Sequence, residues 1–263
     1  MLFSLLLACG LTSAPTLVDH GFRQMYNLQF AQAHVTFADW QRSHPADPLG
    51  PVADAAAYLF AEFDRLRILQ AEFFTDDTGF FQGKKPSPDP AVKLQFLAAL
   101  SRSEQLITKA LLANPKDPDA LFADVLRRGL HADYLGLVEK NYLDSLREMK
   151  AGRLRAEQLL QQSPACYDAY VAVGTENYML SQKPMPVRWV LRLTGARTDK
   201  DEGLRQLANA AEKGRYLLPF AKLLQAVAAL RDNDTPRAKA LLDWLIAEFP
   251  QNRLYAQERS RLR

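Results

Sequence analysis

One stretch, FAQAHVTFADWQRSHP, constrains the fold of this 263-residue chain more than any other. Its key residues are spaced by three, four, three and five positions: Phe30, Ala33, Phe37, Trp40 and Pro45. Steps of three and four positions return to one face of an α-helix, and a proline just beyond them stops the helix. The stretch therefore predicts a helix with a buried seam and a defined end.

Helical periodicity extends over almost the whole sequence, whereas the alternation typical of strands is scarce. Proline-containing breaks separate the periodic stretches, at 44–48, 114–118, 163–164 and 249–252. Asp47, Asp117 and Asn252 come after these prolines and are expected to cap the helices that follow. The predicted helices are 16–28, 30–43, 51–72, 88–113, 117–133, 137–162, 166–181, 199–213, 217–231, 235–248 and 252–262.

Two units of the chain resemble the tetratricopeptide repeat (TPR), a pair of antiparallel helices of about 34 residues. In the first unit, Gly21 is the small residue on the helix that precedes the opening stretch. The resemblance implies that Ala33 lets the two helices approach closely, while Phe30 and Phe37 fill the seam. The second unit has Ala226 on its first helix and the matching residues on its second, namely Ala238, Leu242, Leu245 and Pro250.

Two weaker TPR-like matches lie between these units: Ser103, Ile107, Ala110 and Pro115, and then Ala156, Leu159 and Pro164. The middle departs from the repeat length because the helices near 88–113 and 137–162 are long and residues 73–90 form an insertion. We therefore expect an all-α, solenoid-like array of antiparallel helical hairpins, TPR-like and irregular in the middle. It should form one domain over residues 15–263.

The order of elements in the second half is similar to that of exported bacterial TPR proteins of unassigned function. This likeness rests on VRWVLRLTGARTDKDEGLRQL at 187–207, followed by AAEKGRYL and a closing TPR unit. It supplies no catalytic residues.

The N-terminus carries a short apolar run, LFSLLLA, followed by small residues. This is typical of a secretory signal, and the sequence LLAC also resembles a bacterial lipobox that would attach lipid to Cys9. Residues 1–14 are therefore interpreted as a signal or lipoprotein segment of an exported or periplasmic protein. No Lys or Arg precedes the run, so the alternative is a hydrophobic first helix in a cytoplasmic protein.

Composition excludes several classes of function. A net charge of +3 is too small to indicate a nucleic-acid partner. The two cysteines give no disulfide framework, and Cys166 should be unpaired if the segment that holds Cys9 is removed. No two of the four histidines are three to five positions apart, so no helical zinc pair is present. We predict neither a metal nor a cofactor.

No catalytic motif is assembled in the sequence, so the leading interpretation is a non-enzymatic scaffold in the bacterial envelope. Stacked helical hairpins leave a concave face, which binds peptides or helices when it is apolar. A protein or peptide partner, not identified by the sequence, is expected to contact the first helix of the two clear units. The predicted groove consists of Val18, Phe22, Met25, Phe220, Leu223 and Val227.

Two alternatives remain open. Residues 183–197 form a basic amphipathic stretch whose Arg188, Trp189 and Arg192 could contact an anionic membrane surface, which would make the protein a membrane-surface adaptor. An enzyme is the other alternative, and it would need a deep polar pocket in the irregular middle, near Asp133 and the tyrosines Tyr134 and Tyr142.

Overall fold

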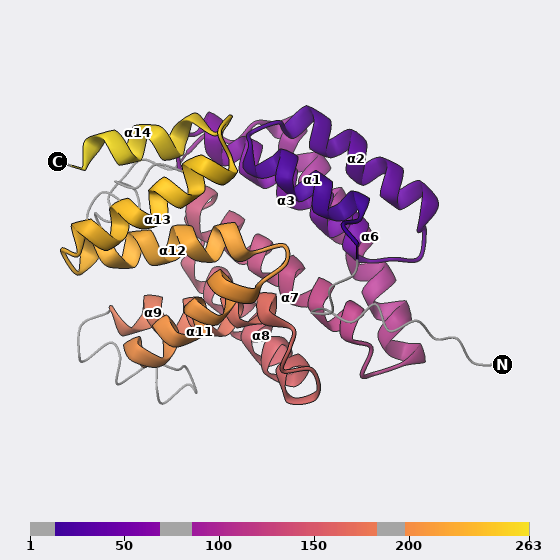
Figure 1. Ribbon diagram of the computed structural model, residues 1–263. Helices are drawn as coiled ribbons and strands as arrows, with labels where there is room; N and C mark the ends of the chain where they lie inside the picture. The colour runs from indigo at the N-terminus through magenta and orange to yellow at the C-terminus, as the bar shows by residue number, and fades with distance from the viewer. Residues whose placement is uncertain (1–13, 69–85, 183–197, 263) are drawn as a thin grey trace.

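The computed structural model describes residues 14–68, 86–182 and 198–262 (Figure 1). This part of the chain contains eleven α-helices and no strands, as the periodicity predicts. The helices are α1 (Leu17–Tyr26), α2 (Phe30–Ser43), α3 (Leu49–Arg65), α6 (Pro90–Ala113), α7 (Pro118–Asp133), α8 (Tyr142–Gln162), α9 (Tyr170–Ser181), α11 (Lys200–Lys213), α12 (Leu218–Arg231), α13 (Thr235–Glu248) and α14 (Arg253–Arg261). A π-helical turn, η1 (Tyr134–Val138), continues α7, and a 3₁₀ turn, η2 (Tyr167–Ala169), precedes α9.

Side-chain caps start many of these helices. The carboxylate of Asp117 accepts hydrogen bonds from the backbone N–H groups of residues 119 and 120, and Asn252 caps α14 in the same way. Both caps were predicted from the residues that follow the prolines. At the start of α1, Thr16 and Asp19 form a reciprocal capping box, which satisfies N–H groups that have no partner within the helix.

Each helix packs mainly against its neighbours in sequence, and the small residues allow close approach. At the seam between α1 and α2, a Cβ on Gly21 would lie only 2.3 Å from a ring carbon of Phe37. Phe37 and Ala33 are fully buried there. Gly21 is therefore required by the packing of α1 on the aromatic ring, as the spacing of the opening stretch indicates.

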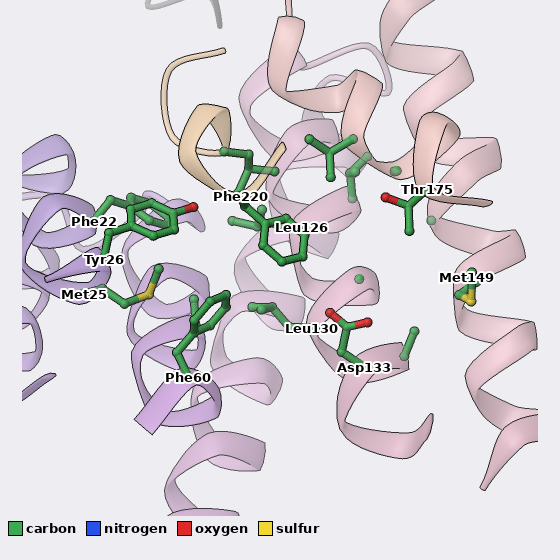
Figure 2. A pocket seen from close by; sticks show the side chains of 18 residues that line it. Phe22, Met25, Tyr26, Phe60, Leu126, Leu130, Asp133, Met149, Thr175 and Phe220 are labelled. Carbon is green, nitrogen blue, oxygen red and sulfur yellow. The ribbon is translucent and has the colours of Figure 1, made fainter. Parts of the chain in front are cut away.

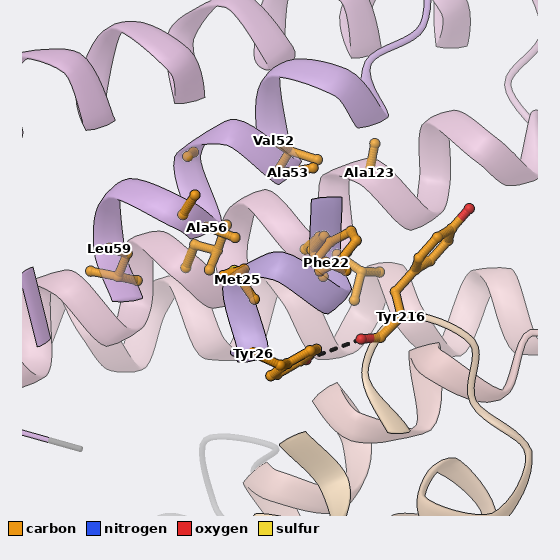
Figure 3. Packing of buried hydrophobic residues seen from close by; sticks show 14 of the residues in the cluster. Phe22, Met25, Tyr26, Val52, Ala53, Ala56, Leu59, Ala123 and Tyr216 are labelled. Carbon is orange, nitrogen blue, oxygen red and sulfur yellow. Dashed lines mark hydrogen bonds between the residues drawn. The ribbon is translucent and has the colours of Figure 1, made fainter. Parts of the chain in front are cut away.

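The two ends of the array also meet, so the row of helices closes on itself (Figure 1). Arg253 forms an ion pair with Asp64 at 2.7 Å, and the side-chain amide of Asn252 donates to the backbone carbonyl of Tyr26. The Tyr26 hydroxyl donates in turn to the carbonyl of Tyr216 at 3.0 Å, inside a buried cluster that joins α1 to α3 and α7 (Figure 3). This closing contact joins residues about 190 positions apart in sequence.

A buried carboxylate fixes the loop that completes the closure. Asp168 accepts hydrogen bonds from the backbone N–H groups of three consecutive residues, 215 to 217, at 2.9 to 3.2 Å. Arg215 reaches across to Asp19 of α1 at 2.7 Å. Burial works against ionisation of Asp19, but the hydrogen bonds from Arg215 and Thr16 outweigh it and lower its pKa.

Two predicted helices differ from the observed ones. The helix expected over 137–162 is divided, because Lys140 adopts a left-handed conformation (φ 57°) and Asn141 then caps α8. The helix expected over 51–72 ends at Arg65, and Arg67 is also left-handed (φ 58°). Neither position carries glycine, the residue that usually marks this conformation, so the sequence gives no signal for these breaks.

Several other predictions fall on residues outside the described ranges. These are the signal segment with Cys9, most of the 73–90 insertion, and the basic stretch that holds Arg188, Trp189 and Arg192. Among the described residues, no helix is both long enough and apolar enough to cross a membrane. Cys166 is fully buried and disulfide-bonded in the 263-residue chain, and the expectation that it is unpaired once the segment holding Cys9 is removed stays a prediction.

Candidate functional site

An apolar pocket of about 130 Å³ lies where the closed array surrounds its centre (Figure 2). Six helices contribute to its walls, from α1 in the first unit to α12 in the last. Its lining residues are Phe22, Met25, Tyr26, Ala56, Phe60, Val125, Leu126, Gly129, Leu130, Ala132, Asp133, Met149, Gly152, Val171, Ala172, Thr175, Leu217 and Phe220. Such a concave, mostly apolar cavity with few polar groups is the usual form of a ligand site.

Aromatic rings form one wall of the pocket. Tyr26 of α1 and Phe60 of α3 have ring centroids 6.3 Å apart in an edge-to-face arrangement. Phe60 makes a similar contact, at 6.1 Å, with Phe220 of α12. This wall exists only because the array closes, since it places α12 beside α1 and α3.

The α7 wall of the pocket contains a glycine that packing does not require. Gly129 lies inside α7, is exposed, and a Cβ built on it would meet no atom within 4 Å. Glycine inside a helix costs about 1 kcal/mol relative to alanine. The missing side chain therefore leaves open space at the pocket and makes helix α7 less stable than an alanine would.

Asp133 is the only carboxylate that lines this pocket (Figure 2). Within the described part of the chain, its side chain has neither an ion-pair partner nor a hydrogen-bond donor. Burial alone raises the pKa of Asp133 to about 7. It stands at the end of α7, immediately before the π-helical turn, a feature that is frequent at functional sites.

Thr175 supplies a second polar group. Its hydroxyl oxygen is buried at the pocket wall and has no hydrogen-bond partner among the described residues. The Tyr26 hydroxyl, by contrast, already donates to the carbonyl of Tyr216. The pocket thus combines an apolar surface with two side chains, Asp133 and Thr175, that can accept new hydrogen bonds.

Ion pairs hold the helices behind these two residues. Arg153 of α8 bonds to Glu176 of α9 at 2.9 Å, and both side chains are buried. Arg128 of α7 bonds to Glu148 of α8 at 3.0 Å. These pairs fix α7, α8 and α9 relative to one another and so hold the wall that carries Asp133 in position.

A second, more open cleft of about 320 Å³ lies beside the closing contact, and it shares Phe22 and Tyr26 with the pocket. The ion pair between Arg215 and Asp19 lies in this cleft, where it joins α1 to the loop before α12. Because the polar side chains here are already paired, the cleft offers less to a ligand than the central pocket does.

The structure brings together some of the residues predicted to form a partner groove. Phe22, Met25 and Phe220 line the central pocket, from α1 on one side and α12 on the other. Val18 and Val227 are buried and Leu223 is partly buried, and none of these three lines the pocket. The predicted set therefore does not form one continuous surface.

The enzyme alternative required a polar pocket near Asp133, Tyr134 and Tyr142. The pocket at Asp133 is apolar, and neither tyrosine lines it. Within the described ranges, no group of three or more His, Cys, Asp or Glu side chains is arranged to hold a metal ion.

Sequence reasoning missed Gly129 and Thr175 and considered Asp133 only for the enzyme alternative. A glycine inside the predicted helix 117–133 was a usable signal, because helix interiors disfavour glycine. No signal in the sequence brings Thr175 and Asp133 to one pocket, since that requires the packing of α9 against α8 and of α8 against α7.

Comparison of the chain with family models, with curated proteins and with solved structures gives no match.

Proposed function

We propose that this protein is a non-enzymatic, TPR-like scaffold that captures a protein or peptide partner by binding one of its side chains in the central pocket. The observation that carries the proposal is the pocket itself, an apolar cavity formed by helices from both ends of the array. Two of its six wall helices, α1 and α12, are the first helices of the units that resemble the TPR in sequence. The proposal therefore keeps the predicted kind of partner but replaces an extended groove with a pocket.

The size of the pocket limits what can enter. An engineered cavity of about 150 Å³ in another protein holds one benzene molecule. A volume of about 130 Å³ is too small for a whole helix and suits a single side chain. Side chains that fill central pockets commonly supply most of the binding energy of an interface.

The test uses substitutions that fill the pocket without disturbing the core. Gly129→Leu places an apolar side chain in the open space, and Gly129→Ala is the matched control that adds only one methyl group. Peptides selected from a random library on the wild-type protein should bind Gly129→Ala with similar affinity and Gly129→Leu at least tenfold more weakly. Equal binding to wild type and Gly129→Leu, measured by calorimetry, would place the partner elsewhere.

We also propose an exported location, based on the N-terminal segment. Because Cys9 is the only other cysteine in the sequence, lipid attachment to Cys9 or removal of residues 1–14 would leave Cys166 as a free thiol. Alkylation of the purified, denatured and unreduced protein distinguishes the processed from the unprocessed chain. The absence of a reactive thiol indicates that Cys9 is retained and oxidised, whereas one reactive thiol indicates removal of residues 1–14 or lipidation of Cys9.

A further inference from the structure

Asp133 places a carboxyl group in the mostly apolar central pocket. The pocket that it lines is formed mainly by apolar and aromatic residues of α1, α3, α7, α8, α9 and α12, and none of the described residues that line it is a cation. A carboxylate in such a position is unfavourable unless it is neutralised or paired. Because the described part of the chain offers Asp133 no partner, a cationic group of a bound ligand could pair with it.

Several charged groups on the neighbouring helices have partners of their own. On α8 and α9, Arg153 bonds to Glu176 at 2.9 Å. On α7, His131 bonds to Glu148 of α8 at 3.3 Å.

The same holds on the other elements around the pocket. On α3, Glu62 is paired with Arg65 at 2.7 Å. On α12, the ammonium of Lys222 lies 4.5 Å from the ring centroid of Trp244 of α13. Of the charged residues named here, only Asp133 lines the pocket, and it has no partner in the described part of the chain.

We propose that the group bound in the central pocket is an alkyl ammonium, with its nitrogen at Asp133 and its methylene stem along the apolar walls. In a protein partner this group is a lysine side chain. The inference rests on the proposed function, because it names the chemistry of the side chain that the pocket receives.

The polar groups of the pocket favour an ammonium over a guanidinium. An ammonium has three donors, which Asp133, the free hydroxyl oxygen of Thr175 and one water molecule can satisfy. A guanidinium has five donors in a rigid plane, and two protein acceptors would leave most of them unsatisfied in an apolar space. The rings of Phe60 and Phe220 belong to the apolar walls that the methylene stem would contact.

The experiment compares two probes that differ mainly in charge, n-butylammonium and 1-butanol. Their binding to the full chain is followed through the backbone amide NMR signals of Ala132 and Gly152, which line the pocket. At pH 8, we expect saturable shifts with n-butylammonium at concentrations at least tenfold lower than with 1-butanol. Asp133→Asn should abolish that difference.

The matched control is Asp119→Asn. It removes a carboxyl whose pKa is also raised to about 7, but at the opposite end of α7 and outside the pocket. Both variants change the net charge equally, so a general attraction of the cation to the protein would affect them alike. The proposal requires that only Asp133→Asn loses the preference for n-butylammonium.

A pH titration of the wild-type protein gives a second measurement that does not depend on any variant. The cation binds the ionised form of Asp133, which is depleted below about pH 7. The apparent affinity for n-butylammonium should therefore fall by about 30-fold between pH 8 and pH 5.5, while that for 1-butanol changes little. An affinity for n-butylammonium that does not change with pH overturns the proposal.

The outcomes separate this inference from the proposed function. Equal affinities for the two probes, both lost in Gly129→Leu, would overturn the ammonium proposal and leave the pocket as a site for apolar groups. Absence of binding by either probe would contradict both. Replacing lysine by norleucine in peptides selected on the protein then tests whether the ammonium comes from a lysine side chain. If it does, the peptide affinity should fall at least tenfold, whereas an unchanged affinity leaves free alkylamines as the ligand.

Discussion

Gly21, at the seam between α1 and α2, and Gly129, at the central pocket, show two opposite uses of glycine on helix surfaces. At the seam, the space that a side chain of Gly21 would occupy is filled by the ring of Phe37. At the pocket, the corresponding space beside Gly129 is empty. The first glycine is explained by packing of neighbouring helices, whereas the second leaves an opening in a protein whose other walls are closely packed.

The difference shows that packing between neighbouring helices and closure of the whole array depend on different residues in this chain. The seam is determined by residues a few positions apart, in helices that follow each other directly. The pocket depends on closure of the array, where the segment around Tyr216 reaches Tyr26 and Asn252 reaches the end of α1. Experiments that disrupt the seam should therefore affect folding, and experiments that fill the pocket should affect binding.

The largest expected effect comes from removal of the last unit. Truncation after residue 216 deletes α12, α13 and α14 and exposes the aromatic cluster of Phe22, Tyr26 and Phe60, which contacts Phe220 and Phe249 in the full chain. Helices in stacked arrays depend on their neighbours for burial. We expect loss of the cooperative thermal transition in circular dichroism, and a truncated chain that melts like the full chain would refute closure as a source of stability.

The seam and the pocket can be compared directly with the same substitution at each glycine. Gly21→Leu forces a side chain into the ring of Phe37 and should lower the free energy of unfolding by at least about 3 kcal/mol. Gly129→Leu should leave it unchanged or raise it by about 1 kcal/mol, because leucine favours the helix and meets no atom nearby. Urea unfolding measures both, and equal destabilisation would contradict the distinction.

Asp133 gives a pH-dependent effect of about 2 kcal/mol. Burial raises the pKa of Asp133 to about 7 in the folded protein. Between about pH 4 and pH 7 the folded protein therefore binds more protons than the unfolded chain, so the free energy of unfolding falls as the pH rises through this range. The full shift corresponds to about 4 kcal/mol, which we halve because Asp133 as a residue is only partly buried.

Asp133→Asn should therefore stabilise the protein at pH 8, and the difference from wild type should disappear near pH 4. Urea unfolding at both pH values checks this. A variant that is less stable than wild type at pH 8 would show that the carboxylate has a partner in the folded protein.

The smallest effect is expected at the closing ion pair. The hydrogen bonds from Arg215 and Thr16 lower the pKa of Asp19 despite its burial, so Asp19 stabilises the fold above its ordinary pKa, and this contribution is lost as the pH falls through the lowered value. Asp19→Asn should cost about 1 kcal/mol at pH 7 and progressively less below pH 4. A constant difference across this range, in thermal denaturation, would exclude a role for the ion pair.

Much of the fold follows from the sequence because its signals are local. The spacing from Phe30 to Pro45, the caps at Asp117 and Asn252, and the small Gly21 each act within or between neighbouring helices, and the structure confirms them. The all-α array is confirmed for the same reason.

The candidate site could be predicted only in part because it is built from distant segments. Phe22 and Phe220 were assigned to one groove, and the structure does place them around one cavity. Closure of the array, which depends on Asp168 holding the loop at 215–217, has no local pattern. The break at Lys140 has none either, because a lysine rarely adopts a left-handed conformation.

The most direct test of the central claim, that the closed array keeps an accessible apolar pocket beside Gly129, is a crystal structure of the full chain under xenon pressure. Apolar cavities of this size bind xenon. We predict xenon in the space between Phe60, Gly129 and Phe220 in the wild-type protein and in Gly129→Ala, and none in Gly129→Leu. A wild-type pocket without xenon, or one filled by its own side chains, would contradict the account.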